Sequence, residues 1–228
     1  MDSRQRRFPF PYACARDMLY VTQRERAAAM GKPRVRRDRI LFVDLELTCW
    51  DGTPPAGQSP EIIEIGLAEV DTDSLDVIRT ASFLVRPELS DVSDYCEALT
   101  GHSAERLRRE GRPLREAVGT LRKEWGTSSK PWMAWGSDRR AVLSDCARKH
   151  CQDPFSDAFH DLGLQFTLLC GYRSGIGLRQ ACEMLGVPFG GREHSGVDDA
   201  LQAAQAWTAI AKLMRERFGP APSAPGGP

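Results

Sequence analysis

The alternation of apolar and polar positions predicts three strands in the first half of the chain. From Arg39 to Cys49, apolar residues occupy both alternating sets of positions, which is typical of a strand buried on both faces. Two more strands are predicted over residues 62–70 and 77–86, joined by a tight turn rich in Asp and Ser, and Pro87 ends the second of them. These three strands should form a meander.

Helices and short strands alternate in the second half. The pattern predicts helices over 114–125, 137–151, 178–185 and 196–218, with short strands over 132–135 and 158–162. Ser137 is the expected N-cap of the second helix, and Gly186 and Pro188 should stop the third. Ser195 and Asp198 have the spacing of a capping box. A meander followed by this alternation predicts an α/β domain with a mixed central sheet.

Both ends of the chain lack such a pattern. We expect residues 1–38 to form a basic, partly disordered N-terminal arm, residues 39–218 the ordered domain, and residues 219–228 a disordered Pro/Gly tail. Residues 1–40 hold 11 Lys and Arg against 4 Asp and Glu, so the remainder of this formally neutral chain is acidic. The arm is either a solvated segment or an aid in holding a polyanion. Met30 is a second candidate for the start of the natural chain.

Composition points to a globular protein. The chain is 41% hydrophobic and 27% charged, has no apolar run long enough to span a bilayer, and shows no secretory signal at its N-terminus. Seven cysteines form no Cys-x-x-Cys pair, which favours reduced thiols and predicts a cytoplasmic location. Cys146, His150 and Cys151 could suggest zinc, but no second ligand pair accompanies them, and helix-packed thiols are the favoured interpretation.

Asp44 and Glu46 interrupt the apolar pattern of the first strand. Residues two apart on a strand share a face and lie roughly 6.5 Å apart, so both carboxylates point the same way near the strand's C-terminal end, where open α/β sheets bind ligands. Burying two like charges is costly unless cations neutralise them, and carboxylates without soft partners suit Mg²⁺ or Mn²⁺. The alternative is that both residues face solvent on an edge strand. Phe42 lies on the same face of the strand and argues against this alternative.

Three further polar residues, Asp138, His194 and Asp199, are weak evidence for a functional site when each is considered alone. Asp138 follows a predicted strand at the first turn of a helix, where an acid also complements the helix dipole. Asp198 is the better placed of two acids to bond the Ser195 backbone amide, which leaves Asp199 free for another role. His194 lies in a Gly-rich loop that would let its ring approach a ligand, although a lone loop histidine is usually solvated.

In combination these residues resemble the DnaQ-like DEDD exonucleases, in the branch whose fifth residue is histidine (DEDDh). The resemblance covers about Arg39 to Lys212. It is carried by Asp44-x-Glu46, Leu99-Thr100-Gly101, Asp138 and His194-x4-Asp199 in family order. Leu84-Val85-Arg86-Pro87 and Gly191–Ala200 look most like the group that trims RNA 3′ ends, which includes the nuclease acting on histone messages and small interfering RNA, and bacterial relatives.

The resemblance implies a ribonuclease-H-like sheet of five strands, the second antiparallel, with helices on both faces. It implies that Asp44, Glu46, Asp138 and Asp199 ligate two Mg²⁺ ions, for which Mn²⁺ can substitute, and that His194 is the general base. The implied activity is 3′→5′ release of nucleoside 5′-monophosphates from single-stranded ends, RNA preferred. DNA-directed proofreading or repair is one alternative, and a catalytically silent nucleic-acid-binding module is another.

By the same resemblance, several residues should contact the terminal nucleotide. These are Leu45, Leu47, Thr48, Leu99 and Thr100. The family's cleft segment usually continues Leu-Thr-Gly-Ile, whereas this chain has His102, whose ring could stack on the terminal base. Trp50 is either a stacking platform or a core residue that plugs the strand end. The sequence does not determine the oligomeric state, and no membrane partner is expected.

Overall fold

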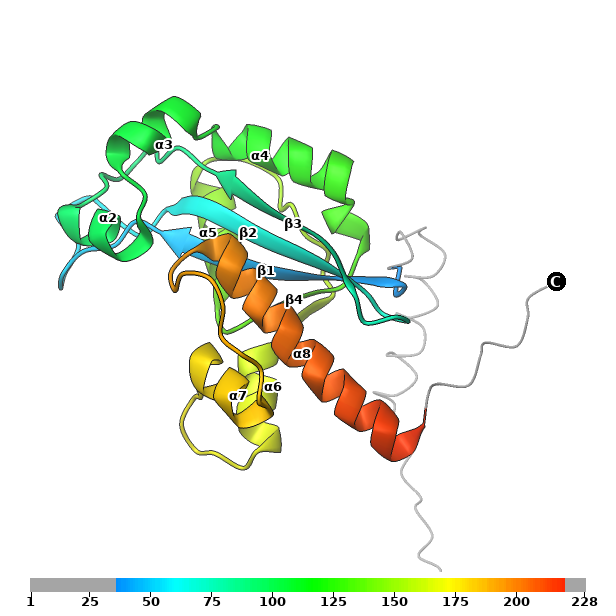
Figure 1. Ribbon diagram of the computed structural model, residues 1–228. Helices are drawn as coiled ribbons and strands as arrows, with labels where there is room; N and C mark the ends of the chain where they lie inside the picture. The colour runs from blue at the N-terminus through cyan, green and yellow to red at the C-terminus, as the bar shows by residue number, and fades with distance from the viewer. Residues whose placement is uncertain (1–35, 220–228) are drawn as a thin grey trace, which may run out of the picture. The chain divides into compact units, whose positions relative to one another are not determined.

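The computed structural model describes residues 36–219 (Figure 1). The predicted basic arm, up to residue 35, and the predicted tail, from residue 220, lie outside the described residues. In chain order the elements are β1 Arg39–Leu47, β2 Ile62–Asp71, β3 Val77–Leu84, α2 Asp94–Thr100, α3 Ala104–Glu110, α4 Leu114–Thr120, β4 Trp132–Ala134, α5 Asp138–Arg148, β5 Phe159–Asp161, α6 Leu162–Leu169, α7 Leu178–Leu185 and α8 Gly196–Phe218. A π turn over Leu121–Trp125 continues α4, and a 3₁₀ turn spans Thr127–Ser129.

The five strands form one mixed sheet in the order β3-β2-β1-β4-β5. Strand β2 is antiparallel to both neighbours, and β1, β4 and β5 are parallel. This arrangement confirms the predicted five-stranded sheet with an antiparallel second strand. It also places β1 in the centre, so the alternative of a solvent-facing edge strand for Asp44 and Glu46 is wrong.

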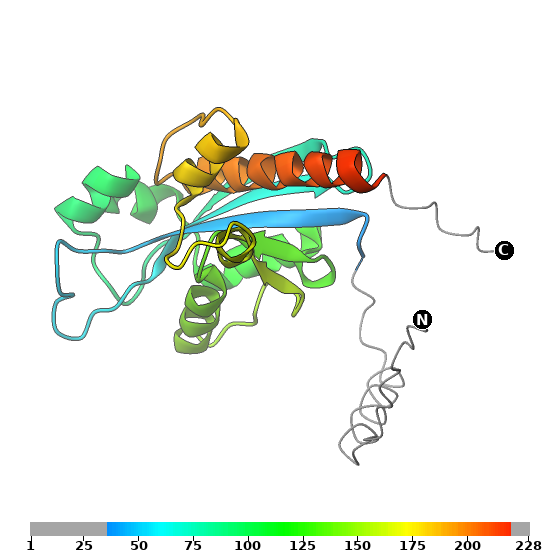
Figure 2. The same cartoon turned by 90° about the horizontal axis from the view of Figure 1, so that it is seen from below.

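Helices cover both faces of the sheet (Figure 2). One face packs Ile40 and Phe42 against the small side chains of α8, including Ala200, Ala203 and Ala204. The other face carries a larger apolar cluster that includes residues of β1, α4 and α5. Alternate residues of β1 enter these two clusters, which is why its sequence is apolar at both sets of positions.

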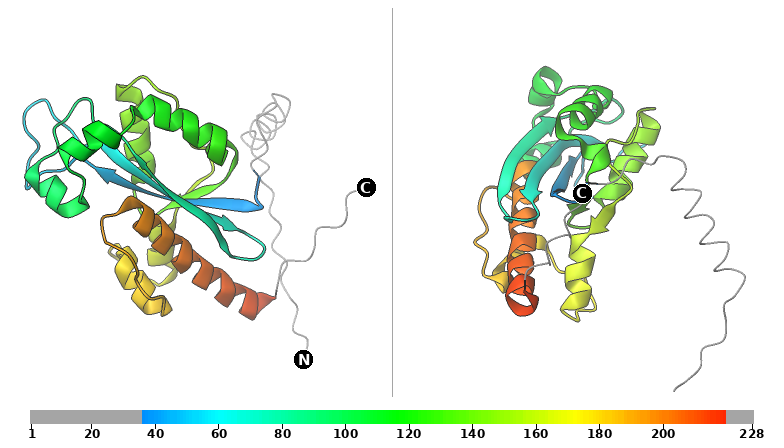
Figure 3. Two further views of the ribbon diagram at one scale, coloured as in Figure 1. Left: turned by 45° about the horizontal axis from the view of Figure 1, so that its top comes forward. Right: turned by 90° about the vertical axis from the view of Figure 1, so that its right-hand side faces the viewer.

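Helix α8 comes unusually close to the sheet at its first residue, and Figure 3 shows it running along the sheet. A methyl group at Gly66 of β2 would lie only 1.9 Å from the carbonyl atoms of Gly196. The start of α8 can therefore rest on β2 only because Gly66 lacks a side chain. This contact brings the first turn of α8 beside the C-terminal half of β1.

Most of the predicted elements are confirmed to within a few residues, and three helices are missed. Helices α2 and α3 follow the side-chain N-caps Ser93 and Ser103, but each is only seven residues long and has little periodicity. Helix α6 follows the N-cap Asp161, whose carboxylate accepts a hydrogen bond from the Leu164 amide. Leu164, Leu168 and Leu169 are apolar although they are exposed, so the sequence of α6 lacks the alternation of apolar and polar faces that predicts a surface helix.

Two predicted caps are corrected. Ser137 precedes α5 as expected, yet its hydroxyl makes no capping hydrogen bond. Ser195 and Asp198 do not form a capping box either: Asp198 accepts a hydrogen bond from the Arg192 amide at 3.0 Å. The loop before α8 folds back over the helix start, so the acids of the first turn bond loop amides instead of the Ser195 amide.

Candidate active site

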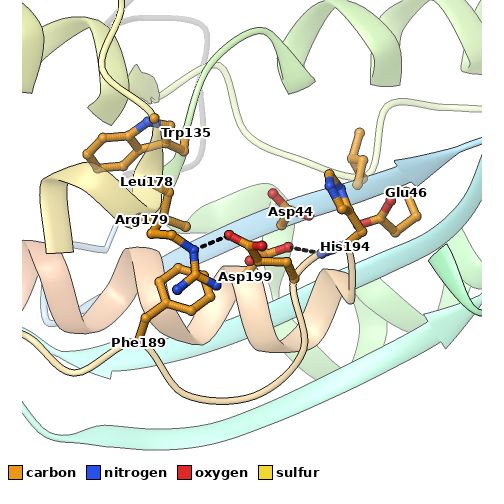
Figure 4. A pocket seen from close by; sticks show the side chains of 11 residues that line it. Asp44, Glu46, Trp135, Leu178, Arg179, Phe189, His194 and Asp199 are labelled. Atoms are coloured by element: carbon orange, nitrogen blue, oxygen red, sulfur yellow. Dashed lines mark hydrogen bonds and ion pairs between the residues drawn. The ribbon is translucent and has the colours of Figure 1, made fainter. Parts of the chain in front are cut away.

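Three of the predicted carboxylates converge between β1 and α8. Oxygen atoms of Asp44, Glu46 and Asp199 all lie within 4.8 Å of one another. Asp44 and Glu46 project from the same face of β1, and Asp199 reaches them from the first turn of α8 (Figure 4). The sequence places these residues far apart, and the Gly66–Gly196 contact brings them together.

Asp138 lies next to this group, at the start of α5. It does not belong to the set of three mutually close carboxylates, but its charge is the largest of those that raise the pKa of Asp44. Burial raises the pKa of Asp138 itself to about 6, against the opposing effect of backbone hydrogen bonds at Asp138 and Leu45. Asp138 is thus a half-buried acid at the start of α5 whose charge acts on Asp44.

The electrostatics of the cluster favour a bound cation. Burial, followed by the charges of neighbouring carboxylates, raises the pKa of Asp44 well above its ordinary value and that of Glu46 to about 8. Burial also raises the pKa of Asp199. Taking several carboxylates out of water costs several kcal/mol per ion unless a counter-charge compensates. A set of hard oxygen donors matches Mg²⁺ or Mn²⁺, so these residues fit a divalent metal ion.

His194 faces the same pocket from the loop before α8. His194 is exposed, and its backbone is in the left-handed region with a φ of +59°. Its backbone amide donates a hydrogen bond to Asp199 Oδ2 at 2.9 Å, so its imidazole is not needed to hold Asp199. Figure 4 shows this ring beside Glu46.

The pocket around these groups has a volume of about 340 Å³. Leu45, which is predicted to contact the terminal nucleotide, lines the pocket, together with residues that the sequence did not single out: Trp135, Gly177, Leu178, Arg179, Phe189 and Glu193. The guanidinium of Arg179 lies 4.1 Å from the centre of the Phe189 ring and pairs with Glu193 (Figure 4). The aromatic residues Trp135 and Phe189 offer apolar surface beside the acids. Trp135 directly precedes Gly136-Ser137-Asp138, which was the available signal for it.

The predicted nucleotide-contacting residues divide into two groups. Trp50, Leu47 and Leu99 are half-buried, whereas Thr48 and Thr100 are buried with their hydroxyl groups engaged. Thr48 Oγ1 accepts a hydrogen bond from the Glu61 amide at 3.0 Å, and Thr100 Oγ1 donates to the Cys96 carbonyl at 2.9 Å. Any contact of these two threonines with a nucleotide would involve other atoms, and substrate contact by the whole group stays a prediction.

His102 has a different environment from the one predicted. It is only 6% exposed, and its Nε2 lies 2.7 Å from Glu64 Oε2. The ring is thus held by a buried carboxylate. Glu64 is itself a residue that the sequence analysis missed, although a charged residue within Ile62-Ile63-Glu64-Ile65 was a visible interruption of a buried strand.

Arg192 ties the His194 loop to α2. Its guanidinium donates to the Leu99 carbonyl at 3.1 Å and lies against Gly101, where a methyl group would lie 1.7 Å from Nη1. Gly101 has a φ of +75° and closes α2 in the left-handed conformation. The loop with the candidate base is therefore anchored to the segment predicted to line the substrate.

The zinc alternative finds no support within residues 36–219. Cys146 belongs to the main apolar cluster, and Cys151 packs against it. The one group of metal-ligating residues found there is Asp44, Glu46 and Asp199. Both thiols pack in the apolar core, but only Cys146 lies on a helix, because α5 ends at Arg148 and Cys151 follows it in a loop.

The unusual pKa values predict how stability depends on pH without metal. Glu46 and Asp138 keep protons in the folded protein that the unfolded chain releases above a pH of about 4. Unfolding therefore releases protons at intermediate pH, so stability should fall as the pH rises from about 4 toward the folded-state pKa values of about 6 and 8. We expect the Tm of EDTA-treated protein to fall between these limits and the fall to be smaller in Glu46→Gln.

Divalent ions should oppose this loss. Carboxylates bind metal in their deprotonated form, so Mn²⁺ should raise the Tm more at about pH 8 than at about pH 5. Thermal unfolding with and without Mn²⁺ at both pH values measures the difference. An equal Tm gain at both pH values would contradict the assignment of raised pKa values to the metal-binding carboxylates.

Comparison with known proteins was consistent with this geometry. The family model for exonucleases of the RNase_T type matches residues 41–207. The human 3′-5′ exoribonuclease 1 is 29% identical over 180 residues, which cover 74% of this chain and 51% of the relative. The chain spans about half the length of the mammalian 3′-5′ exoribonuclease 1 relatives and about a third of the length of the ERI1 exoribonuclease 2 relatives.

Two solved structures show the same fold. The nuclease domain of 3′hExo, a DEDDh family member bound to rAMP, superposes with a TM-score of 0.70 at 23% identity, covering 82% of this chain and 96% of that one. The Mg²⁺- and Mn²⁺-bound form of S. pombe Pop2p superposes with a TM-score of 0.59 at 15% identity, covering 91% and 93%. The sheet is therefore of the ribonuclease-H-like type, as predicted.

Proposed function

The chain belongs to the RNase_T exonuclease family, and from that membership we propose that it is a metal-dependent 3′→5′ exonuclease. It would release nucleoside 5′-monophosphates from single-stranded 3′ ends, with a preference for RNA. The observation that carries the proposal is the convergence of Asp44, Glu46 and Asp199 beside His194 in one pocket. The relative named an exoribonuclease supports the preference for RNA.

Asp44, Glu46, Asp138 and Asp199 are the proposed ligands of two divalent ions, with Mg²⁺ the proposed ion and Mn²⁺ a substitute. Bound there, such ions supply Lewis-acid stabilisation of the phosphate charge and an activated water. The raised pKa values of the four acids support this assignment, since a bound cation would favour the ionised form of each carboxylate.

The other residues of the pocket would hold and orient the substrate. His194 is the proposed general base that accepts the proton of the attacking water, because its ring faces the cluster from an exposed loop. Trp135 and Phe189 offer apolar ring surface for nucleobases, and base–aromatic stacking contributes about 1–3 kcal/mol per base. Leu45 would pack beside the terminal nucleotide.

The remaining assignments are proposals of the same kind. We place the exonuclease domain at residues 39–218, close to the matched region, with residues 1–38 as a basic arm that assists in holding RNA and residues 219–228 as a tail. Among residues 36–219, no helix is long and apolar enough to cross a membrane. The cytoplasmic location rests on the cysteine pattern, and the six described cysteines carry no disulfide.

A time course on labelled oligonucleotides tests the function. With Mn²⁺ or Mg²⁺, single-stranded RNA with a free 3′ end should shorten one nucleotide at a time and yield 5′-monophosphates. A matched DNA strand should react about tenfold more slowly, because it lacks the 2′-hydroxyl as a hydrogen-bonding group. EDTA should stop both reactions.

The same assay separates the alternatives. Equal or faster shortening of DNA would favour the DNA-directed exonuclease. Products from RNA with a blocked 3′ end would contradict exonuclease action. A protein that binds Mn²⁺ and RNA yet releases no mononucleotide would favour the silent binding module.

A further inference from the structure

Glu64 is a buried residue beside the carboxylate cluster of Asp44, Glu46 and Asp199. Both of its carboxylate oxygens already accept hydrogen bonds from the protein. Glu64 lies on β2 and is 1% exposed. Oε1 accepts a hydrogen bond from Ser82 Oγ at 2.6 Å, and Oε2 accepts from His102 Nε2 at 2.7 Å and from the Gly196 amide at 3.0 Å. Burial alone would raise the pKa of Glu64, but these hydrogen bonds outweigh it and lower the pKa. Glu64 is thus an ionised acid that is satisfied by the protein and is not a member of the metal cluster.

The contact with Gly196 bears on the position of Asp199. Gly196 is the first residue of α8, and the preceding Ser195 provides no side-chain cap. The Glu64 carboxylate bonds the first amide of the helix in its place, and an added methyl group on Gly196 would lie 3.1 Å from Glu64 Cδ. Asp199 projects from this same first turn, so the carboxylate that holds the turn on β2 also sets where Asp199 meets Asp44 and Glu46.

His102 connects this carboxylate to the candidate substrate segment. It directly follows Leu99-Thr100-Gly101, and its backbone amide donates to Thr100 Oγ1 at 3.2 Å. An ionised carboxylate can only accept, so His102 Nε2 is the donor to Glu64, and Nδ1 lies 3.4 Å from Arg106 Nη1. The family's segment usually has Ile at this position. In this chain His102 instead forms hydrogen bonds that connect Thr100, through Glu64, to the first amide of α8.

We propose that Glu64 and His102 are positioning residues that hold the first turn of α8, and with it Asp199, in the geometry that binds divalent ions. Glu64 bonds the helix directly, and His102 acts through Glu64. The inference rests on the proposed function, because it presupposes that Asp199 is a metal ligand. Groups that orient metal ligands from outside the coordination sphere typically change metal affinity by about 10–100-fold when removed.

Direct Mn²⁺ binding by the full chain, measured by titration calorimetry, is the primary test. Glu64→Ala should weaken Mn²⁺ binding by about tenfold or more. Glu69→Ala is the matched control: Glu69 is on the same strand, is also buried, and is paired with Lys130 at 2.5 Å and Arg79 at 2.6 Å, outside the pocket. Both variants should lose stability, but only Glu64→Ala should lose metal affinity.

The His102 variants test the link. His102→Ile should weaken Mn²⁺ binding less than Glu64→Ala, and His102→Gln, whose amide can still donate to Glu64, should stay nearer to the unmodified protein. The double variant Glu64→Ala/His102→Ile should bind Mn²⁺ no more weakly than Glu64→Ala alone, because His102 acts only through Glu64. Additive losses would overturn that part of the inference.

Activity provides a second readout. The Mn²⁺ concentration for half-maximal rate should rise in Glu64→Ala, while the KM for RNA at saturating Mn²⁺ stays near that of the unmodified protein. If Glu64→Ala does not fold, Glu64→Gln against Glu69→Gln makes the same comparison. Equal Mn²⁺ affinity in the Glu64 and Glu69 variants would overturn the inference and leave the proposed function standing, whereas an unmodified protein that binds no Mn²⁺ would overturn both.

Discussion

Replacing Asp44 with Asn is expected to reduce mononucleotide release by about a thousandfold or more while raising the Tm of the metal-free protein. The loss follows from the removal of a central metal ligand, because about 4 kcal/mol of transition-state stabilisation corresponds to a thousandfold in rate. The gain in stability follows from the raised pKa of Asp44, which is buried among like charges and costs stability wherever it ionises. Rates on labelled RNA and thermal unfolding in EDTA measure the two effects.

Because the rate should fall while the Tm rises, the experiment distinguishes the loss of a metal ligand from the loss of folded protein. A variant that has lost activity by unfolding would have a lower Tm, whereas Asp44→Asn should have a higher one. Asp94→Asn is a suitable control, because Asp94 is exposed in the first turn of α2 and should leave the rate unchanged. Undiminished activity of Asp44→Asn would reject the metal mechanism.

Replacing His194 with Ala is expected to lower kcat by about 10²–10⁴-fold and to leave Mn²⁺ affinity nearly unchanged. The rate falls because the attacking water loses its proton acceptor. Metal affinity persists because the backbone amide of His194, and not its ring, bonds Asp199. Single-turnover rates at saturating Mn²⁺, together with a Mn²⁺ titration, measure both quantities.

The control for this prediction is another exposed histidine. His160, on β5, does not line the pocket, and His160→Ala should retain the full rate. A parallel loss of kcat and Mn²⁺ affinity in His194→Ala would assign the ring to metal binding or loop structure in place of proton transfer.

Local sequence predicted the elements that depend on local chemistry. Apolar residues in both alternating sets of β1 positions favour burial on both faces, so a central strand was predictable, as were two carboxylates on one of its faces. The left-handed Gly186 ends α7 as expected. Short α2 and α3 were not predictable from periodicity, because seven residues make only about two helical turns.

Hydrogen-bonding partners of the acids could not be assigned from spacing. Asp198 has the spacing of a capping-box acid, yet it bonds the Arg192 amide because the loop before α8 turns back at His194. His102 was expected at the nucleotide, but the fold places Glu64, 38 positions earlier, within 2.7 Å of its ring. Spacing rules describe one turn of helix and carry no information about a loop or strand that arrives from elsewhere.

By itself the sequence determined the composition of the site: the acids of β1, the Asp at the start of α5, and the His and Asp around the start of α8. Only the tertiary structure decided how they meet. The approach of Gly196 to Gly66 sets Asp199 against β1, Arg192 anchors the His194 loop to α2, and Glu64 fills the place of a missing helix cap. The physical reason is that residue type and local pattern encode burial and charge, whereas distances between distant segments follow from which surfaces can pack closely.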